Sequence, residues 1–498
     1  MNNKYIFNKW RAYYPYLILF LGAFIVLLAT PLAPFANKLT NVDSNVYIYC
    51  SEQILNGKIM YKELFDHKGP MLYVFNVIGL LIGGKNTTGI WLIELILLFV
   101  SLVYIFKSAS IYFDRLIALI STLFSLFLIM LLLVEGQGGN CTEEYAIPFI
   151  SVSMYYFLLF LKQQIINKYH FVIIACCCIC TFLLKPNFIS LWLVGYFFVF
   201  IILLKNKKLK KLLPISVTTI ITFLVICIPF SVYFTLTDSW SDFKFCFWDF
   251  NKSYSDVSFI GILSRTIKRV WYAGHFWLSL IGRIHVVLFI FVGIVYFKYM
   301  KDKIEAFFLF FAIILTLVMI SIGILFDLLH YYLPFAPLFV FLYAFVCHFL
   351  IKKTTINPML IAGLLFLLFS FGCIRQLKST YKKQNPLENL ITFIKENSEK
   401  TDKITVVGHD CSIYNLSGRE SVSKYSYIFP IASVKQYGAM IAENYMKDIE
   451  NRKPRIIITI TSSDYNEYFP MLHEILNTNY EEFILPDTYQ YYSCWLRK

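Results

Sequence analysis

Long apolar runs separated by short basic segments fill the first three quarters of the chain. Runs of membrane-spanning length begin near Tyr14, Gly89, Arg115, Tyr145, Phe171, Phe188, Leu212, Phe276, Ile304, Tyr331 and Pro358. They are close to the roughly 20 residues that a transmembrane helix needs, and they lack the alternation of polar positions that barrel strands show. The pattern therefore predicts an α-helical polytopic membrane protein with about eleven transmembrane helices.

The pattern changes at about Thr380, where charged residues return. Residues 387–398, 436–451 and 465–476 have the spacing of helices, and residues 403–408 and 454–461 read as buried strands. Residues 482–485 and 489–495 are expected to close the sheet. We therefore predict a transmembrane domain at residues 1–379 and a small α/β domain at residues 380–498.

Charge fixes the expected topology. The loops between the apolar runs carry lysine clusters, such as Lys205 to Lys211, and such loops stay in the cytoplasm. An inside N-terminus, read as an uncleaved first helix, then leaves residues 36–88, 134–144 and 235–275 outside. The C-terminal domain also becomes extracytoplasmic. The apolar segment 69–84 is expected to be interfacial or re-entrant, since a full span there would place the five-lysine cluster outside.

Composition excludes other classes of protein. The chain is 58% apolar and 15% charged, whereas soluble proteins carry roughly 25% charged residues. The net charge of +14 lies in short clusters between apolar runs, which indicates topology signals and argues against nucleic acid as a partner. The 12 cysteines have no metal-site or disulfide-framework spacing and are expected to pack as small apolar side chains. The expected location is a bacterial plasma membrane.

Two outer loops carry the candidate chemistry. The first contains Asp43 and the run Asp66-His67-Lys68-Gly69-Pro70, and the second contains Glu143 and Glu144. A carboxylate beside apolar surface is a plausible general base, and a lysine can neutralise a phosphate leaving group. Charged loop residues are also common for solubility alone. The two loops are expected to converge on one pocket at the membrane surface.

These motifs resemble the C-type glycosyltransferase superfamily, whose polytopic enzymes use sugars linked to polyprenyl phosphate. The resemblance is to the aminoarabinose transferase and protein O-mannosyltransferase group. An acidic residue, Asp43, follows the first helix; Asp66-His67-Lys68-Gly69-Pro70 is similar to the group's Asp-Lys-Pro element; and Glu143-Glu144 forms the second acidic loop. Gly69 departs from that element, where the group has its first proline.

The resemblance implies that residues 1–379 are the catalytic domain and that the transfer is inverting, with Asp43 as the base. Lys68 would contact the donor phosphate, Asp66 and His67 would line the same pocket, and Glu143 or Glu144 would be the second acidic residue. His330 and Tyr331 match a later family element near the substrate. The implied partners are a polyprenyl-phosphate-sugar donor, a lipid, glycan or protein acceptor, and membrane lipids. No cofactor is expected, with a divalent metal ion as the alternative.

Other residues leave alternatives open. Arg265, Lys268 and Arg269 share one helical face and could bind lipid phosphate or anionic headgroups. Lys185 could snorkel to the outer surface, which we favour, or point into the site, and we expect Glu94 to face the helix bundle. His409-Asp410-Cys411 is interpreted as a turn at a strand end.

Two other functions compete with glycosyl transfer from the lipid-linked donor. They are a surface-polysaccharide polymerase or ligase, which would depend on outer arginines, and a lipid-linked saccharide transporter.

Overall fold

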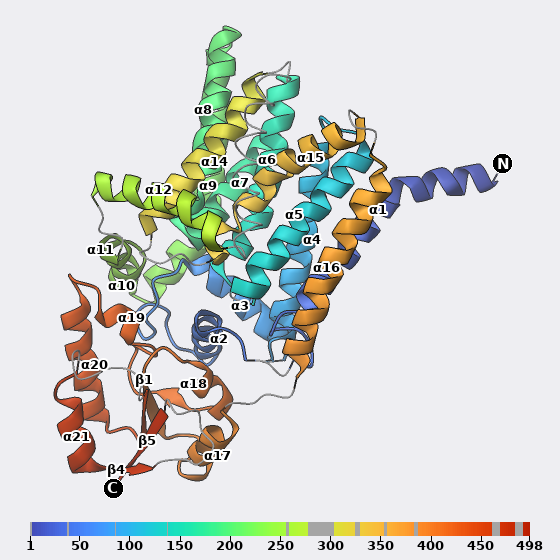
Figure 1. Cartoon of the computed structure of the whole chain (residues 1–498). Coiled ribbons are helices and arrows are strands. Elements are labelled where there is room, and N and C mark those ends of the chain that lie inside the picture. Colours follow the sequence, from blue (N-terminus) through green and yellow to red (C-terminus); the bar gives the residue numbers. More distant parts are fainter. Residues whose placement is uncertain are drawn as a thin grey trace. The chain divides into compact units, whose positions relative to one another are not determined.

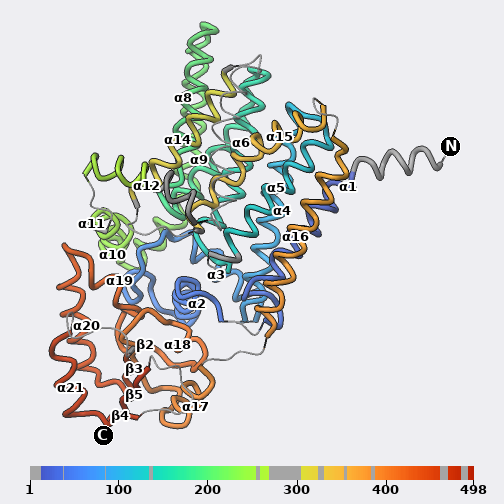
Figure 2. Tube along the Cα trace, in the orientation of Figure 1, coloured from blue at the N-terminus to red at the C-terminus, as the bar shows by residue number. Residues whose placement is uncertain are grey.

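The computed structural model describes residues 2–36, 39–84, 86–136, 138–254, 258–276, 303–323, 329–352, 356–382, 387–460, 469–483 and 492–498 (Figure 1). Contacts divide the chain into two compact units. Unit 1 comprises Met1–Pro34, Ile90–Phe230 and Val257–Thr380, and unit 2 comprises Phe35–Gly89, Ser231–Asp256 and Tyr381–Lys498. Each unit is thus assembled from three separate segments of the chain, as the trace in Figure 2 shows by colour.

Unit 1 is built from long apolar helices. They are α1 (Asn2–Leu28), α4 (Thr88–Ser110), α5 (Arg115–Gly136), α6 (Thr142–Gln163), α7 (Lys168–Leu184), α8 (Ser190–Lys205), α9 (Leu212–Leu236), α12 (Phe259–Phe276), α14 (Lys303–Gly323), α15 (Phe335–Lys352) and α16 (Pro358–Tyr381), with short 3-10 turns at Pro186–Phe188, Leu209–Lys211 and Leu329–Tyr332. Among the described residues, 7 helices are long and apolar enough to cross a membrane. The predicted helical membrane protein is confirmed. The number of spans and their orientation stay predictions, and the helix expected from Phe276 falls outside the described residues.

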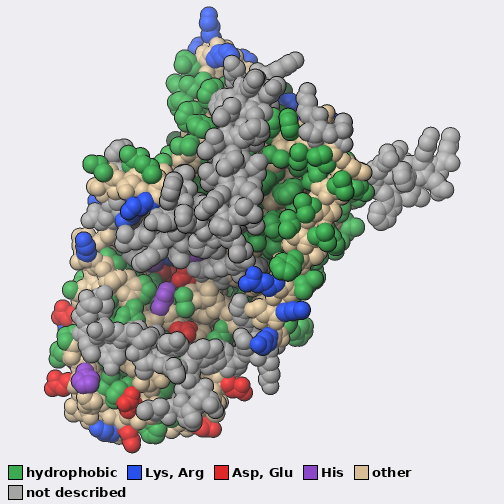
Figure 3. Space-filling model, viewed as in Figure 1, with side chains coloured by type: hydrophobic (Ala, Val, Ile, Leu, Met, Phe, Trp, Pro, Cys, Tyr) green, Lys and Arg blue, Asp and Glu red, His purple; other side chains and the backbone are tan. Residues whose placement is uncertain are grey.

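Close packing and an apolar outer surface distinguish the helices of unit 1. Ile117 and Ile120 of α5 form a buried cluster with Ala344 and Cys347 of α15. Outward-facing side chains of α16 from Met359 to Phe371 are instead apolar, and Phe371 is 72% exposed; Figure 3 shows apolar surface in green. Helices in lipid associate through close side-chain packing while apolar groups face the hydrocarbon. The two kinds of surface therefore fit a bilayer environment.

Unit 2 contains a mixed sheet with short helices. Its strands are β1 (Lys403–Val407), β2 (Glu420–Ser421), β3 (Ile456–Ile460), β4 (Tyr480–Phe483) and β5 (Tyr492–Arg497), in the order β2-β1-β3-β5-β4. β2, β1 and β3 are parallel, and β5 is antiparallel to both β3 and β4. Ile456, Ile457 and Ile458 are all fully buried, so both faces of β3 are covered, as is usual for a central parallel strand.

The helices of unit 2 come from all three of its segments. They are α2 (Val42–Leu55), α3 (Pro70–Ile82), α10 (Trp240–Lys244), a π-helical turn at Phe245–Phe250, α11 (Asn251–Tyr254), α17 (Glu388–Glu396), α18 (Ser412–Ser417), α19 (Phe429–Ala432), α20 (Gly438–Arg452) and α21 (Leu472–Asn479). The predicted small C-terminal sheet domain is confirmed. The helix expected at 465–476 overlaps α21, and the part of it at 465–468 lies outside the described residues.

Helix α2 of the first predicted outer loop packs against the sheet domain. The amide of Ser421 donates to the Tyr49 hydroxyl over 2.8 Å, and the Asn415 side chain donates to the Asn45 carbonyl over 3.1 Å. The Tyr49 and Tyr414 rings lie 5.0 Å apart. The first outer loop thus joins the C-terminal segment in one compact unit, whereas the division at residue 380 into a catalytic and an α/β domain stays a prediction.

The short helix α3 occupies the segment whose membrane role was ambiguous. Its 13 residues span about 20 Å at 1.5 Å per residue, less than the roughly 30 Å of hydrocarbon in a bilayer. The α3 backbone packs closely against Gly89, where only a glycine fits, because an added Cβ at this position would lie 1.9 Å from the Gly79 carbonyl oxygen. The helix is too short for a full span, and its interfacial position stays a prediction.

Candidate active site

Asp66 is the centre of a buried hydrogen-bond network in unit 2. Its carboxylate is 1% exposed and accepts hydrogen bonds from the hydroxyls of Tyr73 and Tyr427, the latter over 2.8 Å. It also accepts the backbone N–H of His67 over 2.7 Å. Burial and the neighbouring Asp66 charge raise the pKa of Tyr427 well above its ordinary value, so this phenol stays a hydrogen-bond donor. Several donors thereby compensate the cost of burying a carboxylate.

The network continues from Asp66 through His67 to Lys68. The Lys68 ammonium lies 2.7 Å from His67 Nε2, and His67 Nδ1 lies 3.4 Å from an Asp66 carboxylate oxygen. A lysine ammonium can only donate, so Nε2 must accept and the ring proton must sit on Nδ1, facing Asp66. His67 is therefore neutral and sets the position of the Lys68 charge.

The backbone around this network is also held in place. The Tyr61 hydroxyl donates to the Lys68 carbonyl over 2.8 Å, and the Asn251 side chain donates to the His67 carbonyl over 2.7 Å. The amide of the fully buried Phe65 donates to the Lys424 carbonyl over 2.9 Å. The Asp66-His67-Lys68 run is thus anchored by residues from each of the three segments of unit 2.

Asp43 lies in the first turn of α2, where the side chain of Asn41 caps the helix by accepting the Ser44 amide. One Asp43 oxygen is 3.6 Å from His409 Nε2, and the Asp43 side chain is 28% exposed. Burial lowers the pKa of His409, although the nearby Asp43 charge opposes this shift. His409 is therefore neutral near pH 7, and its contact with Asp43 is no ion pair there.

His409 connects the two predicted parts of the site. The charges of Asp43, Lys68 and Asp66 all act on His409, in that order of strength. The His409 ring also lies 5.1 Å from the Tyr427 ring. Asp43 and the Asp66-His67-Lys68 run, separated by more than 20 residues of sequence, therefore share one neighbourhood in unit 2.

A second cluster of charges lies in unit 1, at the start of α6. Glu143 is 2% exposed and pairs with the Lys185 ammonium over 2.8 Å, and the Thr142 hydroxyl donates to its other oxygen over 2.9 Å. The Lys185 ammonium also lies 3.9 Å from the centre of the Tyr331 ring. Of the two orientations left open for Lys185, the structure shows the inward one and not the favoured outward one, because the buried Glu143 carboxylate attracts its ammonium.

Glu144 and Glu94 form a neighbouring buried pair in unit 1. Glu94 is 1% and Glu144 5% exposed, and the two carboxyl groups interact. The amide of Asn140 donates to Glu94 over 2.5 Å, and the Tyr145 hydroxyl donates to the Asn140 side chain over 2.9 Å. The predicted inward orientation of Glu94 is confirmed. Glu143 has a cationic partner and Glu144 an acidic one, so the two adjacent glutamates differ in environment.

The remaining predicted residues all lie in unit 1. His330 is 3% exposed, and the centre of its ring lies 4.7 Å from that of Tyr331, which is 5% exposed; the two ring planes are tilted by 36°. In α12, Arg265 is partly buried and Lys268 is exposed, whereas the side chain of Arg269 lies outside the part described. His330 and Tyr331 thus lie near Glu143 and Lys185, while a role of α12 in binding lipid phosphate stays a prediction.

Several residues of these clusters were missed by the sequence analysis. Tyr427 lies 361 positions from Asp66, and no local pattern links the two. His409 was interpreted as part of a turn at a strand end, where it indeed follows β1, but its proximity to Asp43 depends on the packing of α2. No group of three or more His, Cys, Asp or Glu side chains that could hold a metal ion occurs among the described residues.

Comparisons with known proteins agree with this architecture. The family model of dolichyl-phosphate-mannose-protein mannosyltransferases matches residues 67–233. A search of curated protein sequences finds no match. The crystal structure of ArnT from Cupriavidus metallidurans in the apo state superimposes with a TM-score of 0.62 at 12% identity, covering 97% of this chain and 98% of ArnT.

Two further solved structures share the fold. ArnT from the same organism bound to undecaprenyl phosphate gives a TM-score of 0.62 at 12% identity, with 96% of this chain and 97% of that chain covered. The Archaeoglobus fulgidus oligosaccharyltransferase in complex with Zn and sulfate gives 0.55 at 15% identity, covering 95% of this chain and 72% of that one. The predicted resemblance is confirmed by the mannosyltransferase family model over residues 67–233, and the solved structures show that the chain has the fold of ArnT and of the oligosaccharyltransferase.

Proposed function

We propose that this chain moves a sugar from a polyprenyl-phosphate donor to an acceptor at the outer face of the membrane, with inversion and with Asp43 as the base. The observation that carries the proposal is the shared neighbourhood of Asp43 and Lys68 around His409. A proton acceptor and a cation for the leaving phosphate are the two groups that such a displacement needs.

The reaction is a single displacement at the anomeric carbon. The acceptor hydroxyl or amine transfers its proton to Asp43 while its lone pair forms the new bond to the anomeric carbon. The bond between that carbon and the phosphate oxygen breaks, and its electron pair leaves with the polyprenyl phosphate. Attack opposite the leaving group inverts the configuration. The Asp43 carboxylate is accessible because its side chain is partly exposed. Its negative charge is not neutralised by His409, because that ring is neutral.

Lys68 stabilises the negative charge that grows on the departing phosphate. The neutral His67 ring holds its ammonium, and Asp66 holds the ring in the required tautomer. Prearranged charges aimed at the leaving group lower the barrier because they need not reorganise during the reaction. We infer that Asp66 and His67 position Lys68, with Tyr427 and Tyr73 fixing Asp66 in turn.

The donor class is supported by the solved structure of ArnT bound to undecaprenyl phosphate, which shares the fold of this chain. A lipid-linked donor also suits the outer face of a bacterial plasma membrane, which is the side where the basic loops predict the C-terminal domain. The acceptor is a lipid, a glycan or a protein that offers a hydroxyl or an amine. No step is assigned to a metal ion, since the described residues gather no ligand set for one.

The decisive experiment measures transfer from a radiolabelled polyprenyl-phosphate-sugar pool in membranes that contain wild type or Asp43→Asn. Asparagine keeps the size of the side chain but cannot act as a base, so transfer should be lost while expression and donor binding stay normal. Asp238→Asn is the matched control, because the Asp238 side chain is fully exposed in the same unit.

Unchanged transfer by Asp43→Asn would remove this residue from the chemistry. A parallel Arg265→Gln variant then distinguishes the alternatives: loss of activity only there would favour a polysaccharide polymerase or ligase. Retention of transfer in both variants, together with saccharide movement across vesicles, would favour a transporter.

A further inference from the structure

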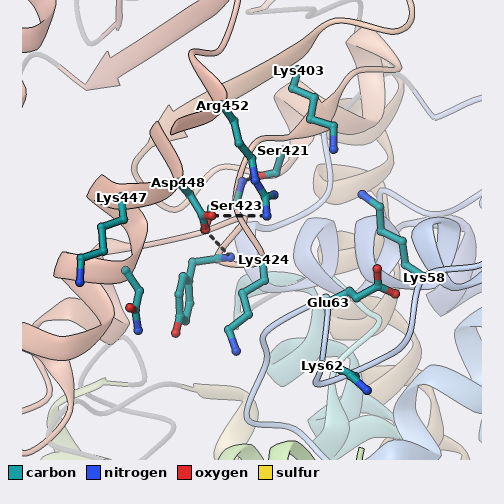
Figure 4. Close-up of a pocket in the computed structure, with 12 residues that line it drawn as sticks. Lys58, Lys62, Glu63, Lys403, Ser421, Ser423, Lys424, Lys447, Asp448 and Arg452 are labelled. Carbon is teal, nitrogen blue, oxygen red and sulfur yellow. Dashed lines mark hydrogen bonds and ion pairs between the residues drawn. The ribbon is translucent and has the colours of Figure 1, made fainter. Parts of the chain in front are cut away.

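A cationic pocket lies within unit 2, and no residue of the Asp43 and Lys68 neighbourhood lines it. Its volume is about 460 Å³, which lies within the usual range for small-molecule sites. The lining comes from the segment after α2, from the start of β1, from the end of β2 with the residues that follow it, and from α20. Figure 4 shows the side chains that surround it.

The lining carries a large excess of positive charge. Its six basic side chains are Lys58, Lys62, Lys403, Lys424, Lys447 and Arg452, and its two acidic ones are Glu63 and Asp448. A concave surface lined by one sign of charge concentrates ions of the opposite sign. The pocket therefore favours an anion.

Both acidic side chains already serve as local structural acceptors. Asp448 accepts the Ser423 hydroxyl over 2.6 Å and lies 3.5 Å from Arg452, and Figure 4 marks the ion pair between Asp448 and Arg452 with a dashed line. Glu63 accepts the backbone N–H of Ile59 over 2.7 Å. Neither carboxylate pairs with a lysine of the pocket among the ion pairs of the described residues.

Lys424 is the lysine best placed to meet a ligand. Its side chain is partly buried, and within the described residues no ion pair joins it to a carboxylate. Lys58 and Lys403, by contrast, share Glu420 at 2.8 and 4.0 Å, and Lys447 pairs with Glu443 at 2.6 Å. In Figure 4 the Lys424 side chain extends into the open space between Lys58 and Lys62 on one side and Lys447 on the other.

The backbone that presents Lys424 is fixed. Its carbonyl accepts the Phe65 amide over 2.9 Å, and the carbonyl of Val422 accepts from Arg452 over 2.7 Å. The amide of Ser421 donates to Tyr49 over 2.8 Å. A prearranged site loses less conformational entropy when a ligand binds than a mobile one does.

We propose that this pocket binds the phosphate of a phosphorylated saccharide, and that this saccharide is the acceptor of the transfer. Lysine ammonium groups bind phosphate as point charges. Ser421, Ser423 and Asn444 add hydroxyl and amide groups that match sugar hydroxyls, and Tyr425 adds an aromatic surface. The binding stands on the pocket alone, whereas the role as acceptor rests on the proposed function.

The experiment uses the full chain in detergent and isothermal titration with a hexose 1-phosphate, the unphosphorylated hexose and inorganic phosphate as separate probes. The hexose phosphate should bind wild type more tightly than either other probe. Lys424→Gln should weaken its binding by about tenfold or more, the loss expected for one charge-assisted hydrogen bond. Lys424→Arg should retain binding, which keeps the test valid if the glutamine variant is unstable. Lys435→Gln, an exposed lysine outside the pocket, is the matched control.

Equal binding of hexose phosphate by wild type and a folded Lys424→Gln would overturn the site. Equal binding of inorganic phosphate and hexose phosphate would overturn the saccharide part of the proposal. Asp43→Asn should bind the probe normally, so its loss of transfer tests the proposed function separately. The acceptor role predicts that Lys424→Gln raises the KM for the acceptor with little change in kcat. If Lys424→Gln loses probe binding but keeps the KM for the acceptor, the acceptor role is refuted.

Discussion

Replacing Tyr427 by phenylalanine tests whether the C-terminal segment takes part in the chemistry. The substitution removes the hydroxyl that donates to Asp66 over 2.8 Å and leaves the ring that lies against His409. A hydrogen bond to a charged group contributes about 1.5–3 kcal/mol. Loss of that amount from the transition state alone would slow transfer by roughly 10- to 150-fold. Tyr73 and the His67 amide still donate to Asp66, so we expect the lower end, about tenfold in kcat/KM.

The assay compares initial rates of sugar transfer at several donor concentrations in membranes with equal amounts of protein. Tyr445→Phe is the matched control, because its hydroxyl bonds to Thr405 over 2.7 Å in the core of the sheet domain, away from Asp66. Unchanged kcat/KM in Tyr427→Phe would refute a positioning role for Asp66 and His67. An equal fall in both variants would mean that the loss comes from weakened folding instead.

Three further predictions concern the buried charges and a crowded glycine. Lys185→Met leaves Glu143 buried without its cation and should destabilise the protein by about 3–5 kcal/mol. The thermal midpoint of Lys185→Met should fall, and adding Glu143→Gln in a double variant should restore it. An unchanged midpoint in Lys185→Met would contradict the prediction. Burial lowers the pKa of His409 below its ordinary 6.5. As the pH falls through that region, the unfolded chain therefore takes up a proton on His409 that the folded chain does not, so the free energy of unfolding should decline below about pH 6.5 and be level above it. Unfolding measurements on His409→Gln should show a weaker decline. Gly438→Ala would place a Cβ 2.0 Å from a backbone oxygen and should cost about 1–3 kcal/mol. Gly363→Ala, with open space around it, should show no such fall in the thermal midpoint.

The sequence by itself determined the class of the protein. Apolar runs of bilayer length without polar alternation favour helices over barrel strands, and a helix satisfies its backbone hydrogen bonds locally. The return of charges near Thr380 and the strand patterns at 403–408 and 454–461 likewise predicted the sheet domain that contains β1 and β3. The family resemblance came from short motifs at helix ends, where chemistry-bearing residues remain next to each other in the chain.

Only the tertiary structure decided which residues are neighbours. Tyr427 reaches Asp66 and His409 reaches Asp43 because α2 and the Asp66 segment pack against the sheet domain, and hydrophobic periodicity carries no information about such pairings. Lys185 turns inward because Glu143 is buried beside it, whereas the sequence shows only a lysine at a helix end. The cationic pocket also depends on the tertiary structure. Its lysines come from distant stretches of the chain, and in the sequence each one is indistinguishable from an ordinary surface lysine.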